Sequence, residues 1–170
     1  MAILEVLHFP DERLRKKALP VDEIDNNIKE IAHNMLETMY AEGGIGLAAT
    51  QVNIQKRIVV IDLSEEKNQP LILINPELIA EMGKETMREG CLSVPDYFDI
   101  VERANEIDFT YQTLDNDTIT RHADGLLAVC VQHEIDHLNG KLFIDYLSPL
   151  KKQRLKKKIN KQEKLQHNIL

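Results

Sequence analysis

The sequence predicts a single α+β domain in which antiparallel β-sheets wrap around a central buried helix and another helix ends the chain. Three observations lead to this prediction. Strand-like runs follow one another in the middle of the chain, and the last of them turns at "DND" and returns, which suits a hairpin. Residues 124–140 have the length of a helix and begin with a stretch that is apolar all round. The chain has 170 residues, 43% of them hydrophobic, which suffices for one sizeable core.

The first part of the chain is predicted to be helical. The stretch "PDERLRKKA" (10–18) suits a short helix. Residues 24–41 suit a longer one, because apolar side chains recur on one face at helical spacing: Ile28, Ile31, Ala32, Met35 and Met39. The segment "EGGIGLAATQV" (42–52) follows as a glycine-containing loop.

The middle of the chain is predicted to form antiparallel strands. The strand-like runs are "KRIVVIDL" (56–63), "PLILIN" (70–75), "YFDIVERA" (97–104) and "NEIDFTYQTL" (105–114). The last alternates Ile107, Phe109 and Tyr111, then turns at "DND" and returns as "TITRHA" (118–123). Such neighbouring runs are typical of hairpins.

The central helix is predicted to begin after Asp124, a suitable amino-terminal cap, and to end at Gly140, which suits the left-handed turn that stops helices. Its stretch "LLAVCV" (126–131) has no polar face, so the helix should lie inside the protein, surrounded by sheet. Beyond residue 150, Leu155, Ile159 and Gln162 recur at roughly helical spacing.

Composition and charge narrow the class of protein. No apolar stretch approaches the roughly 20 residues that cross a bilayer, and Glu5 comes too early for a signal sequence, so we expect a cytoplasmic protein without a membrane partner. The two cysteines, Cys91 and Cys130, are then better read as bound, reactive or buried thiols than as a disulfide. Residues 148–170 hold eight lysines and arginines and one glutamate, whereas the rest of the chain is strongly acidic.

Two histidines on the central helix predict a metal site. His133 and His137 are four positions apart and project from one helix face, so both imidazoles can reach a common ion. Glu134, one step around the helix, can exchange a proton with a water at that ion. Asp136 is shorter and should orient a ligand or form a structural ion pair. Two core histidines satisfied by hydrogen bonds are the alternative interpretation.

The third ligand must come from outside the helix. Cys130 lies seven residues before His137, about 10 Å along the axis, which is too far for one small ion. Candidates after the helix are Asp145, Glu163 and His167. Before it, "REGCLSVPDY" (88–97) presents Cys91 in an irregular stretch between predicted strands. Its thiolate can complete a Cys/His/His set that leaves a fourth position open, as in catalytic sites.

Other interpretations of these motifs remain open. A metallopeptidase with the H-E-x-x-H motif is one, although its usual later third ligand is not evident. A non-catalytic metal- or RNA-binding module, with the site closed by a fourth protein ligand, is another. A nucleotide site at "GIGLAA" (44–49) is disfavoured, because a helix precedes this segment where a strand is required.

An apolar pocket is predicted beside the metal. Leu126, Val129 and Cys130 stand seven, four and three residues before His133 on the same helix face. They can form one wall, with Ile45 opposite. Packing in the core without any ligand is the alternative for each side chain.

Three separated motifs make the chain resemble the bacterial peptide deformylases, which remove the formyl group from the N-terminal methionine of new proteins. They are "GIGLAATQV" (44–52), "EGCLSVP" (89–95) and "QHEIDH" (132–137), and the likeness extends to "VLHFPDERLRKKA" (6–18) and "GKLFIDYLSPLK" (140–151). The resemblance implies a metallo-amidohydrolase with antiparallel sheets around a central metal-binding helix. Residues 1–147 would form the catalytic part, and 148–170 a basic helical extension of the same domain.

The resemblance also assigns roles to residues. It implies that Cys91, His133 and His137 bind one Fe²⁺, for which Ni²⁺, Co²⁺ or Zn²⁺ can substitute, and that Glu134 is the general acid/base. It implies that the Gln51 side chain and the Leu92 backbone N–H stabilise the oxyanion. The main chain of Ile45 and Gly46 would pair with the substrate peptide as an added strand. The substrates that the resemblance implies are newly made formyl-methionyl polypeptides.

The basic tail suggests a further partner. A solvated helix is the ordinary explanation of a charge run, but eight cations against one anion also suit an RNA surface. By resemblance, residues 151–170 would dock on the ribosome, through ribosomal RNA, while DNA is not expected as a partner.

Overall fold

The computed structural model describes residues 2–168 and has the predicted α+β architecture. In chain order its helices and strands are α1 (Asn26–Ala41), β1 (Gly46–Ala48), β2 (Ile58–Ile61), β3 (Leu71–Met82), β4 (Glu85–Cys91), β5 (Val94–Arg103), β6 (Glu106–Gln112), β7 (Thr118–Asp124), α2 (Gly125–Leu138) and α3 (Pro149–Asn168). Short 3-10 turns lie at Glu12–Arg15, Ala49–Val52 and Phe143–Tyr146. None of the helices described is both long and apolar enough to span a membrane.

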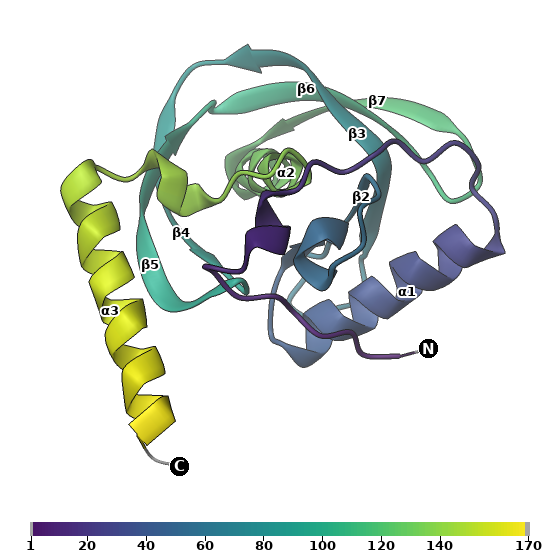
Figure 1. The fold of residues 1–170 in the computed structure, drawn as a ribbon. Helices are drawn as coiled ribbons and strands as arrows, with labels where there is room; N and C mark the ends of the chain where they lie inside the picture. The colour runs from purple at the N-terminus through teal and green to yellow at the C-terminus, as the bar shows by residue number, and fades with distance from the viewer. Residues whose placement is uncertain (1, 169–170) are drawn as a thin grey trace.

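The strands form two antiparallel sheets that curve around α2. One sheet has five strands in the order β1-β2-β3-β6-β7, and the other pairs β4 with β5. Viewed along its axis, α2 lies at the centre of the molecule with the strands around it (Figure 1). The predicted wrapping of antiparallel sheets around a central helix is therefore confirmed.

The five-stranded sheet separates two apolar layers. On β2, Val59 and Ile61 belong to the cluster that packs against α2, whereas Ile58 and Val60 belong to the cluster that packs against α1. This alternation follows from the pleat of a strand, in which successive side chains point to opposite faces. Because β2 is buried on both faces, its sequence is a continuous apolar run. The sheet thus holds α2 in a fixed position, with its histidines in the interior.

Helix α2 begins directly after Asp124 and stops before Gly140, as predicted, but its amino-terminal cap differs from the prediction. Gly140 has φ +78°, and a Cβ there would lie 2.4 Å from the Arg15 carbonyl oxygen, so only glycine fits. Asp124 makes no capping hydrogen bond, contrary to prediction. The reason is that Asp124 is the last residue of β7, paired with Glu106, and the chain turns into the helix at Gly125 with φ +55°.

Several other boundaries differ from the sequence-based prediction. The segment around Cys91 was expected to be irregular, but Cys91 is the last residue of strand β4. Part of the predicted glycine-containing loop forms β1. Both strands contain or adjoin glycine, which is depleted in strands. Strand β3 continues to Met82 past Asn75 and Pro76, where a register shift relative to β6 absorbs the break. The predicted first helix is only the 3-10 turn at Glu12–Arg15.

Candidate metal centre

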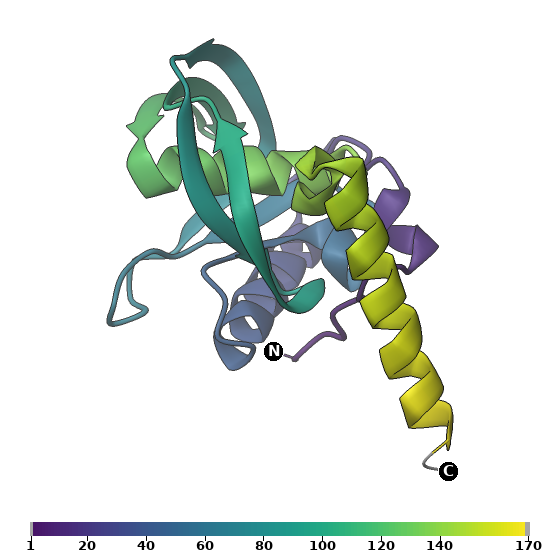
Figure 2. The same cartoon turned by 90° about the vertical axis from the view of Figure 1, so that its left-hand side faces the viewer.

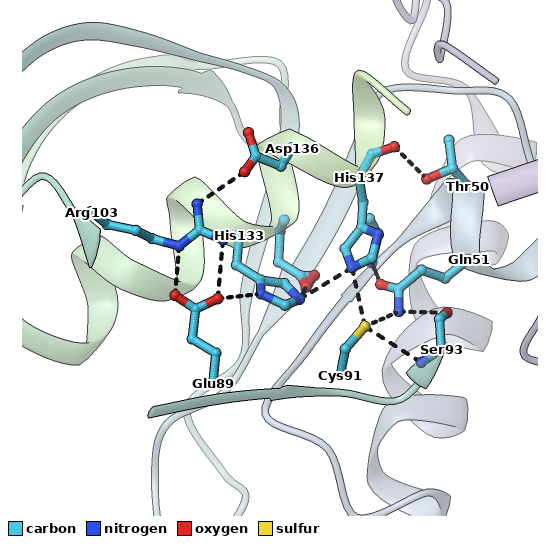
Figure 3. A network of polar contacts seen from close by, with 11 residues as sticks. Thr50, Gln51, Glu89, Cys91, Ser93, Arg103, His133, Asp136 and His137 are labelled. Atoms are coloured by element: carbon cyan, nitrogen blue, oxygen red, sulfur yellow. Dashed lines mark hydrogen bonds and ion pairs between the residues drawn. The ribbon is translucent and has the colours of Figure 1, made fainter. Parts of the chain in front are cut away.

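The structure brings Cys91, His133 and His137 together at one point. His137 Nε2 lies 3.2 Å from Cys91 Sγ and 3.1 Å from His133 Nε2 (Figure 3). Their candidate ligand atoms lie within 4.8 Å of one another, and they form the one such group of histidine, cysteine and carboxylate side chains found among the described residues. Both histidines are on α2, and the cysteine reaches them from the end of β4.

The donor set and its spacing fit a metal ion. Bonds of about 2.0–2.1 Å to nitrogen and 2.3 Å to sulfur place ligand atoms about 3.4–3.6 Å apart in a tetrahedral site. The observed separations of 3.1 and 3.2 Å are within a few tenths of an ångström of those values. A neutral imidazole carries one ring hydrogen, so His137 Nε2 cannot donate to both neighbours. An ion between the three atoms accounts for their convergence better than hydrogen bonds do.

Cys130 is not part of this group, as the distance along the helix predicted. Its side chain is buried, and burial raises the pKa of the Cys130 thiol to about 12, with the nearby Glu134 and Glu89 carboxylates adding to the shift. In this environment the Cys130 thiol is neutral at neutral pH. Of the two cysteines, Cys91 alone is placed to bind a metal with the histidines.

A buried carboxylate orients His133. Glu89 Oε1 lies 2.8 Å from His133 Nδ1, which leaves Nε2 facing the metal position (Figure 3). Arg103 donates from Nε and Nη2 to Glu89, at 2.6 and 3.0 Å, and from Nη1 to Asp136, at 2.9 Å. Asp136 also accepts from the Tyr146 hydroxyl. The expected ion pair of Asp136 is confirmed, and its partner is an arginine that the sequence did not single out.

The hydrogen bonds around Glu89 favour its ionised form. Burial works against ionisation of Glu89, but the hydrogen bonds from His133 and Arg103 outweigh it and lower the pKa of the carboxyl. Carboxylate–histidine pairs of this kind fix the ring tautomer and raise the basicity of a metal ligand. Glu89 could have been found from the sequence if β4 had been predicted as a strand, because residues two apart share a strand face and Cys91 is two positions later.

Gln51 lies beside the metal position from the opposite side. Its Oε1 accepts from the Ala48 backbone N–H, and its Nε2 donates to Ser93 Oγ at 3.1 Å, with Cys91 Sγ at 3.5 Å (Figure 3). The side chain is 1% exposed, so these contacts hold the amide in one orientation. Thr50, its neighbour, donates to the His137 carbonyl oxygen and ties this turn to α2.

Glu134 is the remaining ionisable group at the centre. Burial raises the pKa of the Glu134 carboxyl to about 7, and nearby His133 and Arg103 limit the rise. Its Oε1 lies 3.7 Å from His133 Nε2, and its Oε2 is buried without a hydrogen-bond partner among the described residues. Gly46 permits this position, because a Cβ there would lie 3.3 Å from Glu134 Cδ. A carboxyl with a pKa near neutrality suits proton transfer in both directions.

A cavity of about 610 Å³ opens over these groups. Its lining includes residues of β4 and of the segment that leads into β1. Its wall includes every residue predicted for substrate contact: Ile45, Gly46, Leu126, Val129 and Cys130. Gln51, Cys91, Leu92, His133 and Glu134 line it as well. The cavity therefore joins the predicted apolar pocket to the candidate metal centre.

Comparison with known proteins identifies the family. The family model described as polypeptide deformylase matches residues 3–153. The chain belongs to the polypeptide deformylase family. It is 56% identical over 165 residues to the peptide deformylase of Hamiltonella defensa, covering 97% of this chain and 96% of that one. It is also 56% identical to the peptide deformylase of Nitrosococcus oceani, covering 97% of this chain and 99% of the relative.

Solved deformylase structures share the fold. A peptide deformylase from Legionella pneumophila superposes with a TM-score of 0.91 at 42% identity, with 98% of each chain covered. A peptide deformylase from Ehrlichia chaffeensis in complex with actinonin superposes with a TM-score of 0.90 at 39% identity, covering 96% of this chain and 99% of that one. The predictions of a deformylase family, of an α+β fold and of a metal-dependent hydrolase acting on N-terminal formyl-methionine are therefore confirmed.

Proposed function

We propose that this chain hydrolyses the N-formyl group of newly synthesised formyl-methionyl polypeptides at a metal held by Cys91, His133 and His137, releasing formate. The proposal rests on the convergence of a cysteine sulfur and two imidazoles beside the buried Glu134 carboxyl, next to a cavity that Cys91, His133 and Glu134 line. Membership of the deformylase family supplies the reaction class.

One ion per chain is proposed, and Fe²⁺ is the proposed identity. Thiolate and imidazole ligands suit iron, nickel, cobalt and zinc alike, so any of the last three can replace iron. Three protein ligands leave the fourth position for water or substrate, which distinguishes a catalytic centre from a structural one. When bound, the metal supplies a Lewis acid that lowers the pKa of water and polarises the formyl carbonyl.

Glu134 is proposed to move the proton. Its carboxylate takes a proton from the attacking water and then gives it to the departing amine nitrogen. The pKa near 7 that results from burial of Glu134 suits both steps, because neither protonation state is strongly favoured at neutral pH.

Gln51 and Leu92 are proposed to stabilise the oxyanion. As the formyl carbon becomes tetrahedral, its oxygen gains negative charge, and the Gln51 amide and the Leu92 backbone N–H would donate to it. The contacts of Gln51 with Ala48 and Ser93 keep its amide in place before substrate arrives. Losing one such donor typically costs about 3 kcal/mol of transition-state stabilisation.

The substrate is proposed to lie between two strand edges. In the sheets described, β1 pairs only with β2, and β4 pairs only with β5, so each has an edge available for an extended peptide. Main-chain hydrogen bonds with Ile45 and Gly46 would add the peptide as a strand and tolerate many sequences. The methionine side chain would enter the pocket formed by Leu126, Val129 and Cys130.

The proposed place of action is the ribosome, in the cytoplasm, because the substrate is a newly made polypeptide. Helix α3 carries the basic residues of the chain's end and extends away from the body (Figure 2). Nearly all of its described lysine side chains are exposed. They suit contact with ribosomal RNA through phosphate neutralisation.

To test the proposal, the protein is purified without oxygen and its release of formate from formyl-Met-Ala-Ser is measured. Elemental analysis identifies and counts the bound metal. We expect one formate per new amino terminus and one iron per chain. Glu134→Gln should retain the metal while kcat falls by a factor of about 10²–10⁴. A metallopeptidase would release formyl-methionine instead, and a binding module would release nothing; either result would refute the proposal.

A further inference from the structure

A second cavity lies next to the proposed substrate cavity. It is a groove of about 530 Å³ between α3 and the body, here called the α3 groove. Its walls are His8 and Phe9 of the amino-terminal segment, residues 94–97 at the start of β5, and the inner face of α3 with Leu155, Ile159 and Gln162. Both Figure 1 and Figure 2 show the turn between β4 and β5 beside α3.

The α3 groove and the substrate cavity adjoin each other. His8, Pro95 and Asp96 line both of them. The hairpin of β4 and β5 forms the boundary: Glu89, Gly90 and Cys91 border the substrate cavity, and Val94 and Tyr97 border the groove. A peptide that leaves the substrate cavity past these shared residues would therefore meet the α3 groove next.

The proposed substrate requires such an exit. A newly made polypeptide continues well beyond its formyl-methionine, and an extended chain spans roughly 3.3–3.6 Å per residue. A cavity of about 610 Å³ has the size of a small-ligand site and holds only the first few residues. The rest of the chain must cross the surface beyond this cavity, and the α3 groove adjoins the cavity at His8, Pro95 and Asp96.

The chemistry of the α3 groove suits a chain of variable sequence. Phe9, Leu155 and Ile159 give it an apolar floor, since Leu155 is buried and the other two are half-buried. Lys158, Gln162 and Glu163 are exposed on its rim and present both signs of charge. Apolar contact with a mixed polar rim favours an extended peptide without selecting one sequence.

We propose that the α3 groove binds the downstream residues of the polypeptide whose formyl group lies at the metal centre. The proposal rests on the proposed function, because it identifies where the rest of that substrate lies. Long substrates then gain affinity from the groove that short ones do not.

The experiment compares formyl-Met-Ala-Ser with a formyl-methionyl peptide of about ten residues, which spans roughly 33 Å when extended. Gln162→Trp fills the groove, and Asn160→Trp is the matched control, because Asn160 is an exposed α3 residue that does not line the groove. We expect KM for the longer peptide to rise roughly tenfold in Gln162→Trp, which is about 1.4 kcal/mol, and to stay unchanged in Asn160→Trp. The KM for the tripeptide is the reference within each variant.

Photocrosslinking gives a readout that does not depend on turnover. A benzoylphenylalanine at the sixth position of the longer peptide should label the groove segments 8–9 and 158–163, whereas the same group at the second position should not. Equal KM values for the longer peptide in all three proteins, or labelling elsewhere, would overturn the proposal. So would a Gln162→Trp variant that loses ribosome binding but keeps its KM, since the groove would then belong to a ribosomal partner. Failure of the native chain to release formate from the tripeptide would instead count against the proposed function.

Discussion

At the scale of single residues, the metal centre depends on two side chains outside the ligand set, because Glu89 contacts His133 and Arg103 donates to Glu89. The four-residue spacing of His133 and His137 follows from helix geometry, and distance along the helix correctly disfavoured Cys130 as a ligand. Glu89 and Arg103 were missed, because their roles depend on β4 and β5 lying against α2. Contacts between segments so far apart in sequence leave no local pattern.

Glu89→Gln tests whether the carboxylate supports the metal through His133. The change keeps the shape of the side chain but removes the negative charge that makes the imidazole a better ligand, so metal affinity should fall by about 10–100-fold. Competition with a chelator measures this affinity. Asp136→Asn, which alters the same network one residue further from the metal position, should change it much less. Equal affinities in native chain and Glu89→Gln would contradict the account.

Val129→Ala tests the methionine pocket. Val129 lines the substrate cavity, whereas Val131 on the same helix is fully buried in the core and does not line the cavity. Val129→Ala should raise KM for formyl-methionyl peptides with little change in bound metal. Val131→Ala should instead lower the free energy of unfolding by roughly 1–3 kcal/mol and leave KM unchanged. Equal loss of metal in Val129→Ala would defeat the assignment of this pocket.

At the scale of helices and strands, the apolar pattern of the sequence correctly predicted the elements that are buried on one face or on both faces. Helix α1 and strands β2 and β6 follow their apolar patterns closely. Strand β4 was missed, because most of its residues are only partly buried and charged and apolar side chains mix along it. Its strand conformation depends on pairing with β5 over seven positions, which is a tertiary effect.

His122 tests the pairing of β6 and β7 through its dependence on pH. Its ring lies 2.7 Å from Asp108 and 3.2 Å from Glu106, and these hydrogen bonds raise the pKa of His122 in the folded chain. A raised folded-state pKa stabilises the fold below the unfolded value of about 6.5, and this contribution is lost as the pH rises through the folded value.

Replacing His122 by Gln should therefore lower the free energy of unfolding more at about pH 6 than at about pH 9. Denaturant titrations at the two pH values measure the difference. His33→Gln is the matched control, because the exposed His33 ring contacts the Lys29 carbonyl and not a carboxylate. A cost for His122→Gln that grows with pH would show that the two carboxylates do not stabilise the charged ring.

At the scale of the whole molecule, charge is divided between an acidic body and the basic helix α3. The division was visible in the sequence, and the structure adds how the helix is attached. Leu155 is buried against the body, and Lys151 pairs with Asp99 of β5. Deleting α3 would uncover this apolar contact, so reversal of exposed charges is the cleaner test of its role.

Changing Lys156, Lys157 and Lys161 together to Glu should weaken ribosome binding and reduce its dependence on salt, because fewer phosphates are neutralised. All three side chains are exposed and none lines the α3 groove. Hydrolysis of formyl-Met-Ala-Ser should be unaffected. Sedimentation with ribosomes at several salt concentrations gives the measurement, and an unchanged affinity would exclude α3 as the docking element.

The most direct test of the metal centre is the absorption spectrum of the chain loaded with Co²⁺. A thiolate from Cys91 with two imidazoles predicts one cobalt per chain and a sulfur-to-cobalt charge-transfer band. The band should vanish in Cys91→Ser and persist in Cys130→Ser. A band that survives Cys91→Ser, or that is lost in Cys130→Ser, would contradict the assignment of Cys91 as the third ligand.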